Sequence, residues 1–335
     1  MNTSKLIFIA EAGVNHNGSF SRAIKMISEV SKIGANYVKF QYYSAEELAL
    51  KTLMKADYQK KNTYKKKETQ YEMLKKYELD FNQIKKLKEY CYKKKINFLA
   101  SPFSISKAKD LLYIGCKEFK IASGEITNYQ LLDFLSKKAK TLFLSTGASS
   151  YEEVKNACNI IFKNNFKKKN FYLLHCNSTY PTKIVDANIS TINFFKKKFN
   201  CNVGFSDHTI GFEAGCGAIS LGAVVIEKHF TLDKNLSGPD HLSSLSVSQL
   251  GKYIKILKNV KESLGINSKI ISKEEYKNRK FIRKYIVAKK NIEKNELFTL
   301  CNIDIKRSGK GLPASEFYNI INKRAKKFYK KDEII

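Results

Sequence analysis

The chain has 335 residues, of which 43% are hydrophobic, and a formal net charge of +30 at pH 7. This length fits one large α/β domain followed by a small one, and the hydrophobic fraction excludes a low-complexity disordered chain. A charge of this size raises the question of nucleic-acid or membrane binding. Only five of the basic residues are arginines, however, and the lysines are spread along the chain. We therefore expect solvated helix faces that attract anionic substrates, and no nucleic-acid partner.

The seven cysteines form no C-x-x-C pair, and their odd number argues against a disulfide framework. The first apolar run, Leu6–Ala10, meets Glu11 at once and is too short for a signal peptide. No other stretch is long enough to span a membrane. We therefore expect a soluble, cytoplasmic protein with reduced thiols and no membrane partner.

Eight apolar runs of strand length alternate with helical patterns, which predict helices near Ser21–Ile33, Phe81–Lys95 and Val247–Leu264. A polar, lysine-rich excursion runs from Tyr43 to about Asp80. Near-continuous apolar strands separated by helices indicate a parallel sheet covered on both faces. Eight such units in about 250 residues match an α/β fold of the (β/α)₈ TIM-barrel type. The alternative is a doubly wound open sheet, but no G-x-G-x-x-G turn follows the first run. The runs are Leu6–Ala10, Tyr37–Gln41, Phe98–Ala100, Phe119–Ala122, Leu142–Leu144, Phe171–Leu174, Val203–Phe205 and Val224–Ile226.

The pattern changes at Gly265. We predict a barrel domain at residues 1–265, a polar linker at 266–280 and a β-rich module at 281–335. A module of this size has too small a core to be stable without a partner surface. Its predicted elements are short strands at Tyr285–Ala288, Leu297–Thr299 and Ile303–Arg307, glycine turns at Gly309 and Gly311, and one helix near Ser315–Ile321.

Polar and ionisable residues follow all eight apolar runs, where the barrel strands would end. Active sites of such barrels lie at the C-terminal ends of the strands. A lysine or serine at one strand end would mean little. Polar or ionisable residues at all eight strand ends are hard to explain by packing alone. The sequence therefore predicts an active site built from these ends, which carry Glu11, Lys39, Gln41, Ser101, Lys120, Ser123, Glu125, Ser145, Ser178 and Tyr180.

Two of the five histidines come at the ends of neighbouring runs, His208 after Val203–Phe205 and His229 after Val224–Ile226. Residues two apart in a strand share a face, so Glu227 and His229 should point the same way. Two imidazoles with carboxylates close by suit a borderline divalent metal. The alternative is a pair of hydrogen-bonded core histidines with no ligand.

Eight strings in order resemble the sialic acid synthases, namely the N-acetylneuraminate synthases and their legionaminate and pseudaminate relatives. The tail resembles the antifreeze-like (SAF) domain that ends these enzymes, so the resemblance covers nearly the whole chain. The strings are A-E-A-G-V-N-H-N-G-S (Ala10 to Ser19), V-K-F-Q (Val38 to Gln41), S-P-F (Ser101 to Phe103), K-I-A-S-G-E (Lys120 to Glu125), L-S-T-G (Leu144 to Gly147), G-F-S-D-H-T (Gly204 to Thr209), E-K-H-F-T (Glu227 to Thr231) and S-G-P-D-H (Ser237 to His241).

The resemblance implies condensation of phosphoenolpyruvate with an N-acylated amino sugar such as N-acetylmannosamine, with release of phosphate and a nine-carbon 2-keto acid. It implies a divalent ion, Mn²⁺ or Mg²⁺, held by His208 and His229, and catalytic roles for Glu125 and Glu11. Asn15 and His16 come next in line, and His16 is equally a structural loop residue. Phosphoenolpyruvate would be bound by Lys39, Ser101, Lys120, Ser123, Ser145, Ser178 and Ser206. The acceptor sugar would be bound by Glu11, Gln41, Tyr180, Asp240 and Arg307.

Arg307 matches an arginine that the family's tail domain sends into the partner subunit's barrel to contact the N-acyl group. The resemblance therefore implies a domain-swapped homodimer, which would also cover the small module. The family often has Lys-Arg-Pro-Gly-Asn-Gly at this place, whereas this chain has Ser308 and Lys310. This departure affects the expected identity of the acceptor sugar.

The leading hypothesis is an N-acetylneuraminate synthase, and the alternative is a legionaminate synthase with a 2,4-diacetamido-2,4,6-trideoxymannose acceptor. The first string lacks the Met-Ser-Ala filling expected of pseudaminate enzymes. A Schiff-base aldolase using Lys39 or Lys120 is a different mechanism class. A nucleic-acid or ice-binding protein built on the tail is a non-enzymatic class, against which the dispersed lysines and the furnished barrel mouth argue.

Overall fold

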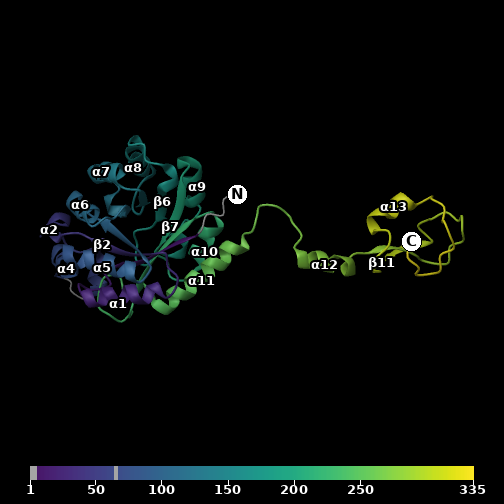
Figure 1. Cartoon of the computed structure of the whole chain (residues 1–335), viewed down its shortest axis with the longest axis horizontal. Coiled ribbons are helices and arrows are strands. Elements are labelled where there is room, and N and C mark those ends of the chain that lie inside the picture. Colours follow the sequence, from purple (N-terminus) through teal and green to yellow (C-terminus); the bar gives the residue numbers. More distant parts are fainter. Residues whose placement is uncertain (1–5, 64–66) are drawn as a thin grey trace. The chain divides into compact units, whose positions relative to one another are not determined.

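The computed structural model describes residues 6–63 and 67–335 (Figure 1). The chain divides into two compact units, Met1–Gly265 and Ile266–Ile335. The first unit contains eight parallel strands with surrounding helices, and the second contains a small antiparallel sheet.

The parallel strands follow the order β3-β2-β1-β8-β7-β6-β5-β4. Strands β3 and β4, at the two ends of this order, also contact each other, so the sheet forms a nearly closed barrel. The predicted (β/α)₈ fold is confirmed, and the open doubly wound sheet is wrong. The strands are β1 (Ile7–Gly13), β2 (Tyr37–Tyr42), β3 (Asn97–Pro102), β4 (Glu118–Ile121), β5 (Thr141–Ser145), β6 (Phe171–Cys176), β7 (Asn202–Asp207) and β8 (Val225–Thr231), with a short β9 (Leu245–Ser246) paired to β8.

Amphipathic helices surround the barrel (Figure 1). In α8, for example, Val154, Ala157 and Ile161 lie on one face because they are three and four residues apart, and all are buried. Side-chain caps begin most of these helices, as Ser150 and Glu153 do for α8. The helices are α1 (Phe20–Ser31), α5 (Phe81–Lys93), α6 (Ile105–Tyr113), α7 (Tyr129–Lys138), α8 (Tyr151–Lys163), α9 (Thr191–Phe199), α10 (Glu213–Ser220) and α11 (Val247–Ser263).

The lysine-rich excursion after β2 contains three short helices that the sequence pattern did not predict: α2 (Ala45–Leu48), α3 (Asp57–Thr63) and α4 (Gln70–Tyr77). Polar contacts order this segment. Lys55 is buried and its ammonium lies 2.6 Å from Glu68, and Thr69 with Glu72 caps α4. Ion pairs and helix caps do not require apolar residues at regular spacing, so the sequence pattern did not indicate these helices.

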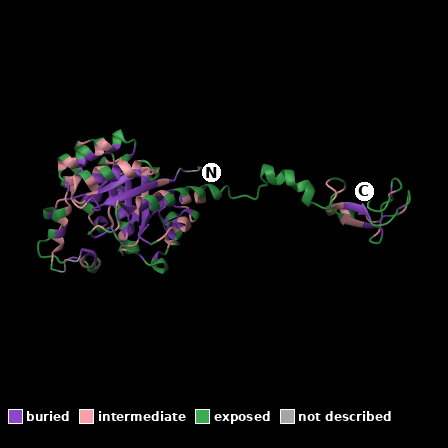
Figure 2. Cartoon of the chain, turned by 90° about the horizontal axis from the view of Figure 1, so that it is seen from below, coloured by how far each residue is buried: buried purple, intermediate pink, exposed green. Residues whose placement is uncertain are grey.

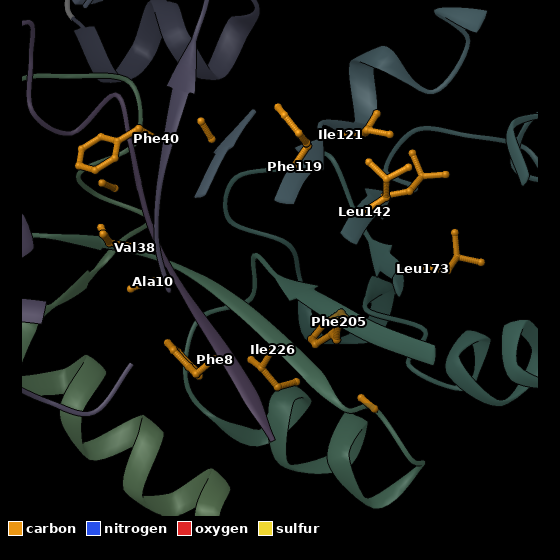
Figure 3. Close-up of a cluster of buried hydrophobic side chains, with 14 of the residues drawn as sticks. Phe8, Ala10, Val38, Phe40, Phe119, Ile121, Leu142, Leu173, Phe205 and Ile226 are labelled. Atoms are coloured by element: carbon orange, nitrogen blue, oxygen red, sulfur yellow. The ribbon is translucent and has the colours of Figure 1, made fainter. Parts of the chain in front are cut away.

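Burial separates two apolar layers in the first unit. The larger layer lies between the outer face of the strands and the helices, and includes Phe8, Val38, Phe119, Phe205 and Ile226 (Figure 3). A smaller layer fills the barrel interior. Strands are accordingly buried on both faces, while the outer sides of the helices are exposed (Figure 2). The interior layer consists of Ile9, Leu99, Phe143, Leu174 and Val225.

The second unit begins with a helix where the sequence predicted a linker, α12 (Lys273–Ile282). A capping box of Ser272 and Glu275 begins this helix, but none of its residues is buried (Figure 2). Because no face of α12 is buried, its sequence has no apolar residues at helical spacing from which the helix could have been predicted. Beyond it, β10 (Tyr285–Ala288) pairs with β11 (Ile303–Lys306), and η4 (Ala314–Glu316) leads into α13 (Phe317–Ile320).

The strand predicted at Leu297–Thr299 is wrong, because Leu297 makes only an isolated bridge with Arg324. The unit has its own small core of Ile286, Ala288, Ile292, Phe298, Ile303, Ile320 and Ala325. In the described parts of both units, no helix combines the length and the apolar run needed to cross a bilayer.

Candidate functional site

A cavity of about 540 Å³ opens at the C-terminal ends of the barrel strands. It brings together all the residues predicted for the site except Asp240 and Arg307. Its polar and ionisable lining comprises Glu11, Lys39, Gln41, Gln70, Ser101, Lys120, Ser123, Glu125, Ser145, Cys176, Ser178, Tyr180, Ser206, His208, Glu227 and His229.

The strand pattern explains why polar groups collect here. Each interior apolar residue stands two positions before a residue that lines the cavity, and residues two apart in a strand share a face. The barrel therefore has an apolar floor and a polar mouth made by the same strands. The pairs are Ile9 and Glu11, Leu99 and Ser101, Phe143 and Ser145, Leu174 and Cys176, and Val225 and Glu227.

A cluster of two lysines and two glutamates occupies the centre of the mouth. Lys39 Nζ lies 2.8 Å from Glu227 Oε2 and 3.3 Å from Glu11 Oε2. Lys120 Nζ lies 3.6 Å from Glu227 Oε1 and donates a hydrogen bond of 2.6 Å to Ser145 Oγ. Glu227 thus joins both lysines, and all four side chains are almost completely buried.

Burial and pairing shift the four pKa values in different directions. Burial raises the pKa of Glu11 to about 7, although Lys39 opposes the shift. Burial lowers the pKa of Lys120 to about 8, with Glu227 opposing. For Lys39, burial would lower the pKa, but Glu11 and Glu227 raise it to about 12. For Glu227, Lys120 and Lys39 outweigh burial and hold its pKa well below its usual range. The cluster therefore offers one firmly cationic lysine and one that burial makes easy to deprotonate.

The two predicted metal ligands lie side by side, with ring centroids 5.3 Å apart. The 2.6 Å contact of His208 Nδ1 with the carbonyl of Asn177 requires Nδ1 to donate, which leaves Nε2 with a free electron pair. In the described chain, no hydrogen-bond partner reaches His229 Nδ1, although this atom is buried. Tyr180 covers the pair, 4.3 Å from His208 and 5.8 Å from His229 between ring centroids.

These residues fit an open divalent-metal site. The buried Nδ1 of His229 has no partner in the described chain, and buried polar atoms normally have one. Burial, together with the charges of His208 and Lys39, holds the pKa of His229 well below its usual range. The ring is therefore neutral, which is the form that binds a metal. The pKa of His208, which burial alone would lower, is raised by Cys176 beside it. A side chain at Gly13 would place Cβ 3.5 Å from His229 Nδ1, so glycine keeps this approach free. No group of three or more metal-binding side chains occurs among the described residues, which leaves other coordination positions to water or substrate.

Two of the serines predicted for phosphoenolpyruvate, Ser123 and Ser178, lie close to Gly147. The Gly147 backbone N–H donates to Ser123 Oγ at 2.9 Å. A Cβ at Gly147 would lie 2.3 Å from Ser178 Oγ, so only glycine allows this approach of the two serines. On the opposite side, Ser101 Oγ is buried and has no hydrogen-bond partner in the described chain. Together these hydroxyls line a polar face beside Lys120.

Glu125 ends the 3₁₀ turn η1 (Ser123–Glu125) after β4 and is buried at the cavity wall. Burial raises the pKa of Glu125, while a hydrogen bond of 2.7 Å from Asn128 Nδ2 opposes the shift. A carboxyl group whose pKa is raised in this way holds its proton more readily than a solvent-exposed glutamate does.

Asp240 lies outside the cavity lining, in the loop after β8. It is buried, and burial raises its pKa to about 6. The loop is fixed by polar side chains, among them Asn15, which the sequence placed next in line for the site. Asn15 Nδ2 donates to the carbonyl of Phe230 at 2.8 Å, and His241 bonds to Thr231 at 2.7 Å and to Asn17 at 3.0 Å. Asn15 therefore connects loops here, as does Asn17, and His16 likewise stays outside the lining, buried with Nδ1 accepting from Gly18 N.

Arg307 directly follows β11 in the second unit and is exposed. All residues that line the cavity belong to the first unit. The predicted contact of Arg307 with the acceptor therefore stays a prediction.

Two ionisable residues of the cavity, Glu227 and Cys176, were not predicted as site residues. Glu227 could have been found from its place two residues before His229 on the same strand face. Cys176 lies with its sulfur 3.7 Å from His208 Nδ1, and nothing in its sequence context distinguishes it from a small core residue.

Comparison with known proteins gives the same picture across the chain. The model of the NeuB family matches residues 26–269, and that of the SAF domain matches residues 283–335. The chain is 41% identical over 331 residues to the N,N'-diacetyllegionaminic acid synthase of Campylobacter jejuni subsp. jejuni serotype O:2, covering 99% of each. It is 36% identical to the N,N'-diacetyllegionaminic acid synthase of Legionella pneumophila subsp. pneumophila, covering 94% of this chain and 89% of that one.

A solved structure agrees. The chain superimposes on the N-acetylneuraminic acid (sialic acid) synthetase of Leptospira borgpetersenii serovar Hardjo-bovis with a TM-score of 0.72 and 32% identity, covering 84% of this chain and 93% of that one. The predicted resemblance and the predicted terminal SAF domain are both confirmed.

Proposed function

The chain belongs to the NeuB family, and we propose that it condenses phosphoenolpyruvate with an N-acylated amino sugar, with release of phosphate. The observation that carries the proposal is the convergence of Lys39, Lys120 and several serines on one cavity beside a histidine pair. Phosphoenolpyruvate carries a phosphate and a carboxylate, and buried ammonium and hydroxyl donors are the groups that bind such anions.

For the acceptor we favour 2,4-diacetamido-2,4,6-trideoxymannose, which would make N,N'-diacetyllegionaminate the product. Sequence analysis preferred N-acetylmannosamine. The preference is reversed because the relatives named as diacetyllegionaminic acid synthases are 41% and 36% identical, against 32% for the sialic acid synthetase. The departure at Ser308 and Lys310 lies beside Arg307, the residue expected to contact the N-acyl group.

The residues of the site divide the work. Lys39 and Lys120 bind the anionic groups of phosphoenolpyruvate, and the serines donate to its oxygens. Glu125 takes the proton from the oxygen of the water that adds at C2. Gln41, Tyr180 and Glu11, which line the cavity, orient the hydroxyls of the open-chain sugar. When Mn²⁺ or Mg²⁺ is bound by His208 and His229, it supplies Lewis-acid polarisation of the acceptor's carbonyl group.

One observation favours a second mechanism. Burial lowers the pKa of Lys120 to about 8, as in lysines that form Schiff bases. Borohydride with pyruvate would trap such an enzyme covalently, and EDTA would leave it active. We expect no trapping and full inhibition by EDTA.

We further propose a homodimer that exchanges its tail modules, in the cytoplasm, where the cysteines stay reduced. Exposed apolar side chains in the loops that follow the barrel strands support this assembly, because they leave an apolar rim at the mouth. They are Leu50, Leu53, Met54, Ile184, Val185, Ile210 and Leu242. Light scattering of the full chain and of residues 1–265 tests it, and a monomeric full chain would refute it.

Phosphate release with Mn²⁺ tests the proposed reaction. We expect turnover with 2,4-diacetamido-2,4,6-trideoxymannose, slower turnover with N-acetylmannosamine, and none with EDTA. Faster turnover with N-acetylmannosamine would restore the neuraminate assignment. No phosphate release with either sugar, metal present, would refute the synthase assignment.

A further inference from the structure

A buried ion pair lies on the outer face of the two strands that carry the histidines. Lys228 Nζ is 2.9 Å from Asp207 Oδ2, and the two side chains are 1% and 0% exposed. Asp207 of β7 and Lys228 of β8 are register partners in the sheet. Each is the immediate chain neighbour of a proposed metal ligand, Asp207 of His208 and Lys228 of His229. Neither lines the cavity.

Asp207 fixes the turn that contains His208. Its Oδ1 accepts from the backbone N–H of Thr209 at 2.9 Å and from the Thr209 hydroxyl at 2.7 Å. Lys228 also donates to the carbonyl of Thr209 at 2.6 Å. The residue after His208 is therefore held from three sides, twice by the strand of His208 and once by the strand of His229. The backbone of His208 cannot shift relative to β8 without breaking buried polar contacts.

Tyr253 of α11 completes the network. Its hydroxyl donates to Asp207 Oδ2 at 2.7 Å, and its ring lies under Lys228 Nζ at 5.6 Å. A Cβ at Gly215 of α10 would lie 1.6 Å from the Tyr253 hydroxyl, so a glycine in this helix opens the path to Asp207. Phe212 stacks on the Tyr253 ring at 5.0 Å. The network is fully enclosed between the strands and two helices.

A gain in folding stability does not explain buried charges of this kind, because apolar side chains of similar volume usually give a core equal or greater stability. Their place beside both histidines supplies another reason. We propose that Asp207, Lys228 and Tyr253 are positioning residues that set the separation of His208 and His229. The inference rests on the proposed metal role of the two histidines. Outer contacts that orient metal ligands affect metal affinity about 10- to 100-fold when they are removed.

The test uses Tyr253→Phe in the full-length protein, which removes one hydroxyl and keeps the ring. The barrel offers a matched control in Tyr42→Phe. Tyr42 is 1% exposed, its hydroxyl donates to Asp110 at 2.7 Å, and Lys107 Nζ lies over its ring at 5.0 Å. The control thus removes a hydroxyl of a buried tyrosine that also donates to an aspartate, but here Asp110 and Lys107 are partly exposed, and none of the three residues is next to a histidine.

Two readouts are taken on both variants and the unmodified protein. The first is the affinity for Mn²⁺ alone, from loss of the free-ion electron paramagnetic resonance signal. The second is amide hydrogen exchange of residues 203–212, which does not require metal. For Tyr253→Phe we expect about tenfold weaker Mn²⁺ binding and faster exchange. For Tyr42→Phe we expect neither change at these places.

Unchanged Mn²⁺ affinity in Tyr253→Phe overturns the proposal, whatever the exchange shows. Equal weakening in both variants also overturns it, because the effect would then reflect general loss of stability. If the unmodified protein binds no Mn²⁺, the metal part of the proposed function fails. The exchange comparison then decides the positioning network by itself, and equal exchange in all three proteins refutes it.

Discussion

Two lysine–carboxylate clusters meet at strand β8, one through Glu227 on its inner face and the other through Lys228 on its outer face, and they behave differently. The inner cluster faces the cavity and joins Glu227 to Lys39 and Lys120. The outer cluster faces the helices and joins Asp207 to Lys228 and Tyr253. Both are buried almost completely, and Glu227 and Lys228 are consecutive residues of β8. Burial therefore does not tell a site from a support.

The two clusters differ in whether their buried polar atoms have hydrogen-bond partners. In the outer cluster, Asp207 accepts from the Thr209 amide, the Thr209 hydroxyl, Tyr253 and Lys228. Around the inner cluster, Ser101 Oγ and His229 Nδ1 are buried without a partner in the described chain. A folded protein leaves few such atoms unless something else binds there. The outer cluster, whose hydrogen bonds are satisfied, holds the backbone, and the unpartnered atoms beside the inner cluster support the proposed ligand site.

Lys228→Met is the variant with the largest expected effect. It leaves the Asp207 carboxylate buried without a counter-charge, which lowers the free energy of unfolding by about 3–5 kcal/mol. Urea unfolding of the barrel measures it. As a control, Lys137→Met removes an exposed lysine 2.6 Å from Asp133, and should leave the midpoint unchanged because exposed pairs contribute little. A Lys228→Met barrel as stable as the unmodified one would contradict the structural role of the outer cluster.

Lys120→Met removes the same side chain from the inner face and should show the opposite result. Glu227 keeps its ion pair with Lys39 at 2.8 Å, so the unfolding free energy changes little. Phosphate release should fall about 100- to 1000-fold, equivalent to about 2.7–4 kcal/mol, because a donor to the proposed substrate is lost. Steady-state kinetics and urea unfolding measure both. Loss of stability without loss of activity would assign Lys120 to structure instead.

The sequence predicted the barrel and most of its mouth because both depend on strand periodicity. Runs such as Leu142–Leu144 are apolar on both faces, and the polar residue two places after an interior one falls at the strand end. The outer cluster was not predicted. Asp207 and Lys228 stand beside the histidines in the same strings, but only the register of β7 and β8 shows that they pair. Tyr253 was harder still, since it comes from a helix far along the chain.

The remaining misses share a physical cause. Capping boxes begin α4 and α12, and an ion pair joins Asp57 to Lys60 in α3, so polar contacts rather than an apolar period define these helices. Asp240 was placed from a resembling string, yet the loop that carries it is set by contacts of Asn15, Asn17 and His241. Such contacts join residues more than two hundred positions apart, and nothing in local pattern reports them.

The smallest predicted effect is a pH dependence that separates the two lysines of the inner cluster. Burial lowers the pKa of Lys120 to about 8, whereas the carboxylates raise that of Lys39 to about 12. Below about pH 8 both lysines are cationic, so the titration of Lys120 contributes no pH dependence to phosphoenolpyruvate affinity there. Above it Lys120 must take up a proton before it can pair with the anion, so affinity should fall about tenfold, or 1.4 kcal/mol, per pH unit. Calorimetric titration without acceptor sugar measures this, and the proton taken up appears as a buffer-dependent heat.

Lys120→Met should bind phosphoenolpyruvate weakly at every pH and lose the slope. The same slope in that variant would assign the titration to another group.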